Sequence, residues 1–109
     1  MDTVTALLSA QALTASGSEV AGHSPSDDAV SVQISVSAAT GTTPSATFSL
    51  LWSNDAVTYS PASPADVFAA ITAAGSVVQR FTRKGKYYKL AWTVTGTTPS
   101  LTTTAFAYI

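Results

Sequence analysis

The stretch that most restricts the fold is VSVQISV, residues 30–36, in which apolar and polar residues alternate without exception. The even-numbered positions are all Val or Ile, and the odd-numbered positions are Ser or Gln. A helix would scatter these apolar residues around its axis, whereas an extended strand puts all of them on one face. Residues 30–36 are therefore predicted to form a strand with one buried face and one polar face.

A second stretch, ATFSLLWS at residues 46–53, alternates in the same way. Its apolar residues of one parity are Ala46, Phe48, Leu50 and Trp52. The residues between the two stretches include glycine and proline, which is typical of a turn. The two stretches are therefore predicted to form a hairpin with a long loop.

The pentapeptide GTTPS occurs twice, at residues 41–45 and 96–100, each time between two expected strands. Gly41 and Gly96 can adopt a positive φ, while Pro44 and Pro99 fix the exit of the turn. The repeat predicts two equivalent hairpins, one in each sheet of a quasi-symmetric sandwich.

The segment RFTRKGKYYK, residues 80–89, contains every Lys and Arg of the chain. A two-residue turn at Lys84 and Gly85 would pair Phe81 with Tyr88 on the core side and Arg80 with Lys89 on the other side. Like charges that lie directly opposite are unfavourable, and an acidic partner surface would relieve them. We therefore interpret this segment as a docking element for an acidic protein surface, with these candidate residues: Arg80, Arg83, Lys84, Lys86, Tyr87 and Lys89.

Nucleic-acid binding is the weaker interpretation of the same segment. The net charge of the chain is −1, and two of the three aromatic residues in the segment are expected to face the core.

Residues 64–74 contain the signals of a helix start and end. Ser63 could cap the N-terminus, Pro64 would occupy the first turn, Asp66 follows three residues after the cap, and Gly75 would end the helix. One short helix is predicted here. An extended strand through Val67, Ala69 and Ile71 is the open alternative.

About seven short strands separated by turn signals predict an all-β chain, folded as an antiparallel β-sandwich or jelly roll with at most one short helix around residues 64–74. Residues 1–109 are expected to form a single domain. Residues 1–16 suit a short helix, a strand or an N-terminal arm.

The chain offers little for catalysis or metal binding. His23 is the single histidine and lies near Ser24, Asp27 and Asp28, but in a loop with proline and without a nucleophile-elbow motif. Asp27 and Asp28 lack the spacing of a calcium loop, and the chain has no cysteine. We expect no enzymatic activity, no metal and no cofactor.

The composition favours a protein that works by contact. Only 10% of residues are charged, while the chain has 15 Ser and 17 Thr, so its surface is rich in hydroxyl groups that are cheaper to bury than ions. No apolar run is long enough to cross a membrane, and the N-terminus lacks the positive charge of a signal peptide. We expect a non-exported protein that makes no membrane contact.

The order of these motifs resembles a group of small virion-associated proteins of tailed bacteriophages. The resemblance covers nearly the whole chain. In that group a V-T-G-T-x-P strand leads to a strand ending near S-N/D-D/G-x-x-Y/W, and a G-K/R-Y-x-K/R strand precedes a second T-G-T-x-P-S turn. The matching residues here are 41–45, 96–100 and the strand entry at Gly85, Lys86, Tyr87 and Lys89, whereas Ala56 replaces the commoner glycine.

The resemblance implies a β-sandwich that coats or joins the phage particle. It favours a capsid decoration protein that is made in the host cytoplasm, stabilises the head, and docks on the major capsid protein or other virion proteins as a homo-oligomer. A tail or head–tail connector component stays open. So does a carbohydrate-binding or adhesin module, for which Tyr59 and Tyr87 would be the exposed aromatic residues while Trp52 and Trp92 belong to the core.

Overall fold

The computed structural model describes residues 4–20 and 28–108, and strands make up most of this part of the chain. The strands are β1 (Val4–Leu13), β2 (Gly17–Val20), β3 (Ala29–Ser53), β4 (Ser60–Val67), β5 (Gly75–Thr82) and β6 (Tyr87–Tyr108). All of their pairings are antiparallel. The described residues form no helix, so none that could cross a membrane is found among them. The predicted all-β antiparallel class is confirmed.

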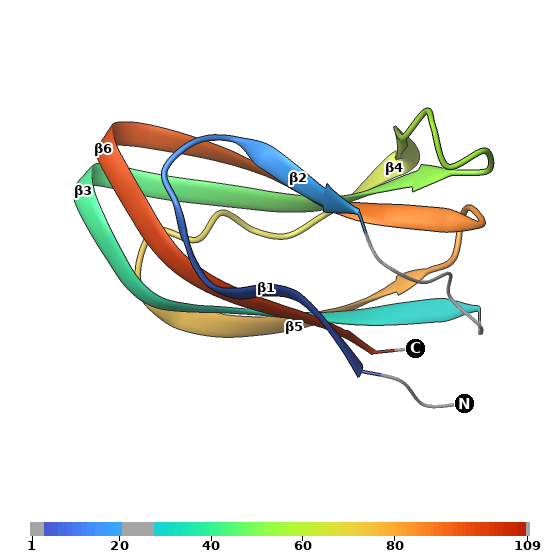
Figure 1. The fold of residues 1–109 in the computed structure, drawn as a ribbon, viewed down its shortest axis with the longest axis horizontal. Coiled ribbons are helices and arrows are strands. Elements are labelled where there is room, and N and C mark those ends of the chain that lie inside the picture. The colour runs from blue at the N-terminus through green and yellow to red at the C-terminus, as the bar shows by residue number, and fades with distance from the viewer. Residues whose placement is uncertain (1–3, 21–27, 109) are drawn as a thin grey trace.

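The framework is a ribbon of two long strands that folds over on itself. β3 and β6 pair along their whole lengths, from Ser31 with Tyr108 to Ser53 with Tyr87. Both strands bend sharply at the same end of the molecule, at the left of Figure 1, where the two GTTPS segments lie. The bend turns one ribbon into two stacked layers.

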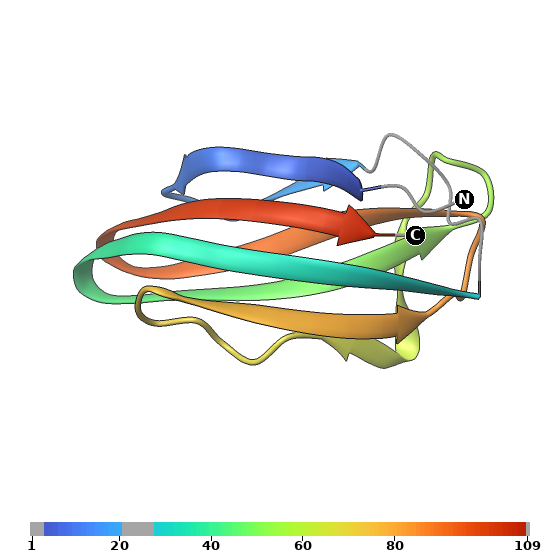
Figure 2. The ribbon, with the colours of Figure 1, turned by 90° about the horizontal axis from the view of Figure 1, so that it is seen from below.

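Each layer takes one half of each long strand and adds a shorter strand on either side. Layer 1 has the order β1, the C-terminal half of β6, the N-terminal half of β3, and β5. Layer 2 has the order β2, the N-terminal half of β6, the C-terminal half of β3, and β4. Figure 2 looks onto the outer face of layer 1, with β1 and β5 at its two edges.

The core lies between the layers and contains the faces that alternation predicted. The even-numbered residues of 30–36 and those of 46–52 are all buried. Phe81, Tyr88, Leu90 and Trp92 are buried as well. The predicted buried faces of residues 30–36 and 46–52, and of Phe81, Tyr88, Leu90 and Trp92, are therefore confirmed.

The predicted hairpins are wrong. Residues 30–36 and 46–52 lie in different layers, so they face each other across the core instead of pairing. Likewise Phe81 pairs with Val30 in layer 1, while Tyr88 pairs with Trp52 in layer 2. Alternation determines which face of a strand is buried, but it does not determine the neighbouring strand.

The two GTTPS segments adopt equivalent conformations, as the repeat predicts, but the prediction of one hairpin in each sheet is wrong. Gly41 and Gly96 have φ values of 106° and 122°, and Thr43 and Thr98 both have φ of 47°. A Cβ on Gly41 would come within 2.5 Å of the Thr98 carbonyl oxygen, and one on Gly96 within 2.8 Å of the Thr43 carbonyl oxygen. The segments thus pack against each other in one bent ribbon, not in separate hairpins.

The helix predicted around residues 64–74 is wrong. β4 continues to Val67, the Phe68 amide then donates to the Phe48 carbonyl at 2.8 Å, and Ile71 exchanges two backbone hydrogen bonds with Ala46. The chain is therefore extended along the edge of layer 2. Its buried side chains are Asp66 and Phe68. The alternative prediction of an extended segment is therefore right, but it assigned the odd-numbered residues to the buried face, whereas the buried Asp66 and Phe68 are even-numbered.

The burial of Phe68 explains why the capping signals did not produce a helix. Its ring packs edge-on against Phe81 of layer 1, with centroids 5.2 Å apart. Backbone pairing with β3 and this contact across the core outweigh a local preference for helix.

The region before residue 14 is a strand over Val4–Leu13, paired with the C-terminal half of β6. Leu7, Leu8 and Leu13 are all buried, although they do not share one parity. Shifts in register between Ala6 and Gln11 allow adjacent leucines to turn inward.

Candidate docking surfaces

The structure divides the predicted basic docking set among three places. Arg80 lies on the outer face of layer 1, opposite Ser31. Lys89 lies on the outer face of layer 2, opposite Leu51. Because these two cations are on different layers, the predicted Arg80–Lys89 pair is wrong, and no like-charge repulsion between them needs to be relieved.

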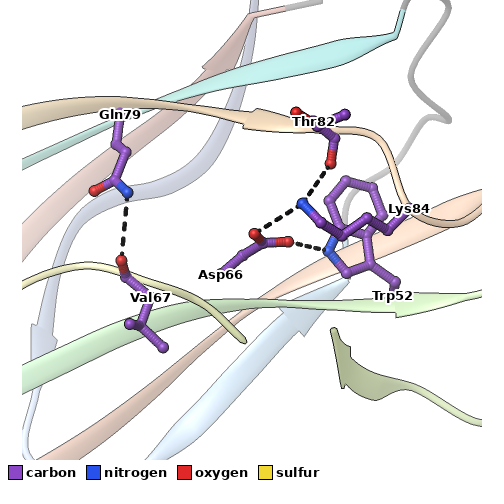
Figure 3. Close-up of polar contacts among 6 residues, drawn as sticks. All are labelled: Trp52, Asp66, Val67, Gln79, Thr82 and Lys84. Carbon is purple, nitrogen blue, oxygen red and sulfur yellow. Dashed lines mark hydrogen bonds and ion pairs between the residues drawn. The ribbon is translucent and has the colours of Figure 1, made fainter. Parts of the chain in front are cut away.

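Lys84 is bound within the protein. Its ammonium group lies 2.9 Å from Asp66 Oδ1 and donates to the Thr82 carbonyl at 3.0 Å. The second oxygen of Asp66 accepts a hydrogen bond of 2.7 Å from the indole nitrogen of Trp52. We call these four residues the Asp66 network, and Figure 3 shows how it joins β3, β4 and the end of β5.

The Asp66 network was not predicted from the sequence. Asp66 is 9% exposed, and its parity matches that of the buried Phe68 two residues later. In the sequence, the shared parity of Asp66 and Phe68 was the signal that Asp66 would face the core if the stretch were a strand and not a helix.

The remaining basic residues at this end also contact the protein itself. Arg83 Nε donates to the Gly85 carbonyl at 3.1 Å, and the Arg83 amide donates to the Asp28 carbonyl at 2.7 Å. The Lys86 ammonium lies 5.5 Å from the centre of the Tyr87 ring. Arg83 and Lys86 therefore make contacts at the connection that joins the two layers at residues 83–86.

On the outer face of layer 2, Lys89 covers an aromatic ring. Its ammonium lies 5.0 Å from the centre of the Tyr59 ring. Tyr59 and Tyr87 are both half-buried, and each has a lysine over its ring. The two tyrosines proposed for sugar stacking are therefore not an open aromatic platform.

The loop after β3 forms an open hollow of about 380 Å³ at the same end of the sandwich. The hollow is lined by Trp52, Ser53, Asn54, Asp55, Thr58, Ser60, Lys84 and Gly85. Asp55 accepts hydrogen bonds from the amides of Val57 and Thr58, both at 2.9 Å, and from the Ser53 hydroxyl at 2.7 Å. These hydrogen bonds to the ionised carboxylate lower the pKa of Asp55 to about 2, and they hold the turn in place.

The same turn places Ala56 in a backbone conformation that favours glycine. Ala56 has φ of 60°, in the left-handed region where a side chain is disfavoured. The hydrogen bonds to Asp55 and Ser53 hold Ala56 in this conformation.

The outer face of layer 1 carries a shallow groove of about 240 Å³ that the sequence analysis did not predict. It is lined by Ser31, Gln33, Val78, Phe106 and Tyr108. The exposed fractions are 62% for Val78, 40% for Phe106 and 45% for Tyr108. Gln33 lies between Val78 and Phe106 in the sheet, so apolar side chains from β5 and β6 follow one row.

The orientation of the last strand produces this groove. In TAFAY, residues 104–108, the small Ala105 and Ala107 are buried and the aromatic side chains point outward. Phe106 and Tyr108 have the same parity, and the size of their side chains alone would assign their face to the core. The inversion of large and small residues was the signal for an exposed aromatic surface.

Over residues 4–20 and 28–108, no group of three potential metal-ligating side chains is present. His23, Ser24 and Asp27 lie outside the described residues. Asp28 is exposed.

Comparisons with known proteins give one informative likeness. No family model and no curated protein matches the chain. Among solved structures, the chain is similar to the SPBc2 prophage-derived protein YomS, with a TM-score of 0.53 and 14% sequence identity. The similarity covers 100% of this chain and 94% of that chain, and it shows a shared fold.

Proposed function

We propose that this chain is a non-enzymatic structural protein of a phage particle, and that the outer face of layer 1 docks on other virion proteins. The foremost form of this proposal is a capsid decoration protein that binds the lattice of the major capsid protein. The fold shared with a prophage-derived protein and the sequence resemblance to virion-associated proteins support it.

The exposed aromatic face is the observation that carries the proposal. Val78 and Phe106 lie on either side of Gln33 in one row across the outer face of the sheet, and the exposed cation Arg80 and Tyr108 lie on either side of Ser31 in the next row. Contiguous apolar surface with polar surroundings marks protein interaction sites. Its aromatic side chains supply contact area, and Arg80 supplies a charge that can meet an acidic residue of the partner.

A lattice suits a face of this modest size. Each copy would bury a small contact area, and homo-oligomers on one shell would hold firmly through many simultaneous contacts. A tail or connector location uses the same surface chemistry and differs in copy number.

Carbohydrate binding is the second candidate, and one observation favours it. The groove sets the Phe106 ring beside the Gln33 amide and the Ser31 hydroxyl, which are groups that recognise sugar rings and their hydroxyls. A glycan would then occupy the groove in place of a virion protein.

Quantitative mass spectrometry of purified particles from the encoding phage tests the proposal. We expect this chain at a copy number close to that of the major capsid protein. A few copies per particle would favour a tail or connector component, and absence from the particle would refute the virion role. Binding of the isolated chain to a glycan array, lost in Phe106→Ser, would then favour the sugar-binding module.

The docking face is tested by two cations on the outer faces of opposite layers, the exposed Arg80 and the half-buried Lys89. We expect Arg80→Ser to weaken binding to particles that lack the chain and to reduce the salt dependence of binding, because Arg80 lies on the same outer face as the groove, opposite Ser31, which lines it. Lys89→Ser removes the same charge from layer 2 and should leave binding unchanged. The reverse result would assign docking to layer 2, and circular dichroism of both variants checks folding.

A further inference from the structure

We propose that β5 is a strand-addition site that pairs antiparallel with β5 of a second copy, about a two-fold axis at Val78. The site is the side of β5 away from β3, and β5 is the gold strand in the lower part of Figure 2. This inference concerns the isolated protein and does not depend on the proposed virion role.

Among the described strands, three of those at sheet edges carry features that hinder pairing with another chain. β1 has two shifts in register and a positive φ at Ala10. β2 is only four residues long. β4 contains Pro61 and Pro64 and pairs with β3 through another shift in register. Short strands, bulges and prolines are the usual devices that protect a sheet edge.

β5 lacks all three of these features. It pairs with β3 in unbroken register from Ala29 with Thr82 to Val36 with Gly75. Alternate residues of such a strand direct their backbone N–H and C=O groups away from the sheet. On the side away from β3, β5 therefore presents a regular row of donors and acceptors that an added strand can bind.

Contacts with layer 2 hold this edge in place. The Gln79 amide nitrogen lies 3.4 Å from the Val67 carbonyl of β4, as Figure 3 shows. Phe81 packs against Phe68 in the core. Less conformational freedom is therefore lost when a second strand binds.

The sequence of β5 is complementary to itself when two copies are antiparallel. Residues that lie opposite in a sheet share a face, so a two-fold register must place each residue opposite one of the same parity. With the axis at Val78, the two Val78 side chains meet, and Arg80 lies opposite Ser76 of the second copy. A register centred on Arg80 would instead place two cations opposite each other, which is unfavourable.

The axis at Val78 also removes the most exposed apolar side chain of layer 1 from water. Val78 is the β5 end of the row that continues through Gln33 to Phe106. Pairing at β5 therefore brings the two Val78 side chains together and makes the outer faces of layer 1 in two copies continuous. A symmetric pair of this kind is the commonest form of a homo-oligomer.

A single introduced cysteine tests the register, because the chain has none of its own. Directly opposite residues in an antiparallel pair have Cα atoms about 4.5 to 5.5 Å apart, which allows a disulfide. We expect Val78→Cys to form a disulfide-linked dimer under mild oxidation. Thr93→Cys, on an exposed position of β6 in layer 2, should remain mostly monomeric, and equal cross-linking of the two variants would overturn the proposal.

Sedimentation equilibrium provides the second measurement. We expect the unmodified chain to form a concentration-dependent dimer, and Val78→Lys to raise its dissociation constant at least about tenfold by placing two ammonium groups opposite each other. Thr93→Lys should not change it. A chain that stays monomeric at all concentrations, or a dimer that Val78→Lys does not weaken, refutes pairing through β5.

If the unmodified chain is monomeric but Val78→Lys abolishes binding to a different protein, the second copy is refuted as the occupant of the edge. These measurements use the isolated protein, so they are independent of whether the chain is found in particles.

Discussion

Asp66 is a carboxylate almost removed from water, and two donors compensate its burial. Trp52 comes from layer 2, and Lys84 comes from the connection between β5 and β6. The lysine side chain is 32% exposed, so solvent screens part of the ion pair. The hydrogen bond from the indole is buried, so its loss would lower the free energy of unfolding more than loss of the ion pair.

We predict that Asp66→Ala lowers the free energy of unfolding by about 2 to 3 kcal/mol, because it leaves the Trp52 indole without its acceptor and Lys84 without its counter-ion. Asp66→Asn keeps an oxygen for the indole and should cost about half as much. Urea unfolding measures both. Glu19→Gln, an exposed change of the same charge, should stay within about 0.5 kcal/mol, and equal losses in the two Asp66 variants would contradict this role of the indole.

Asp55 makes the 53–58 turn sensitive to acid. Its pKa is lowered from 3.8 to about 2 by the hydrogen bonds that its ionised form accepts. A lowered pKa in the folded state means that the ionised carboxylate contributes stability above about pH 4, and this contribution is lost as the pH falls through about 2.

Carbon-detected NMR of the Asp55 carboxyl group should therefore give a titration midpoint near pH 2. In Ser53→Ala, which removes one of the donors, the midpoint should move upward. A midpoint close to 3.8 in the unmodified protein would show that the turn is not formed in solution.

At the scale of elements, the sequence predicts the faces of strands better than their partners. Alternation in residues 30–36 and 46–52 correctly identified the buried side chains. It gave no information on whether the two stretches pair or stack, because both arrangements bury the same residues. The choice depends on the register between β3 and β6, which are far apart in sequence.

The two GTTPS bends lie where the β3–β6 ribbon passes from one layer to the other, and they can be tested as equivalent positions. We predict that Gly41→Ala and Gly96→Ala each lower the free energy of unfolding by more than about 1 kcal/mol, since each glycine has a positive φ and its Cβ would approach a carbonyl oxygen of the other bend. Chemical denaturation should show similar losses in the two variants.

Gly75→Ala is the matched control, because no atom lies within 4 Å of the Cβ it would add. It should be neutral or stabilise the protein by up to about 1 kcal/mol. A large loss in only one of the two GTTPS variants would contradict their equivalence.

For the whole molecule, the candidate surfaces were predicted less well than the fold. The basic segment is conspicuous in the sequence, but ion pairing and ring contacts occupy Lys84, Lys86 and Lys89. The aromatic face arises because Ala105 and Ala107 are buried in the core, so Phe106 and Tyr108 point outward, although residue size alone would predict the opposite. Charge is visible in a sequence, whereas the space available inside a sandwich is known only once the layers are placed.

The bent ribbon also sets how the whole molecule should fold. The pairing of β3 with β6 joins residues as distant in sequence as Ser31 and Tyr108. β1 can pair only after the C-terminal half of β6 has been placed. Closing such long loops costs entropy before the strand contacts compensate it.

We therefore predict that refolding takes on the order of milliseconds to seconds, as in other all-β domains with distant pairings. Stopped-flow fluorescence can follow it, because Trp52 and Trp92 are both buried on folding. Gly96→Ala should slow refolding if the bend forms before the layers close, and should mainly speed unfolding if it forms afterwards. Refolding within microseconds would mean that local hairpins, and not the β3–β6 ribbon, determine the rate.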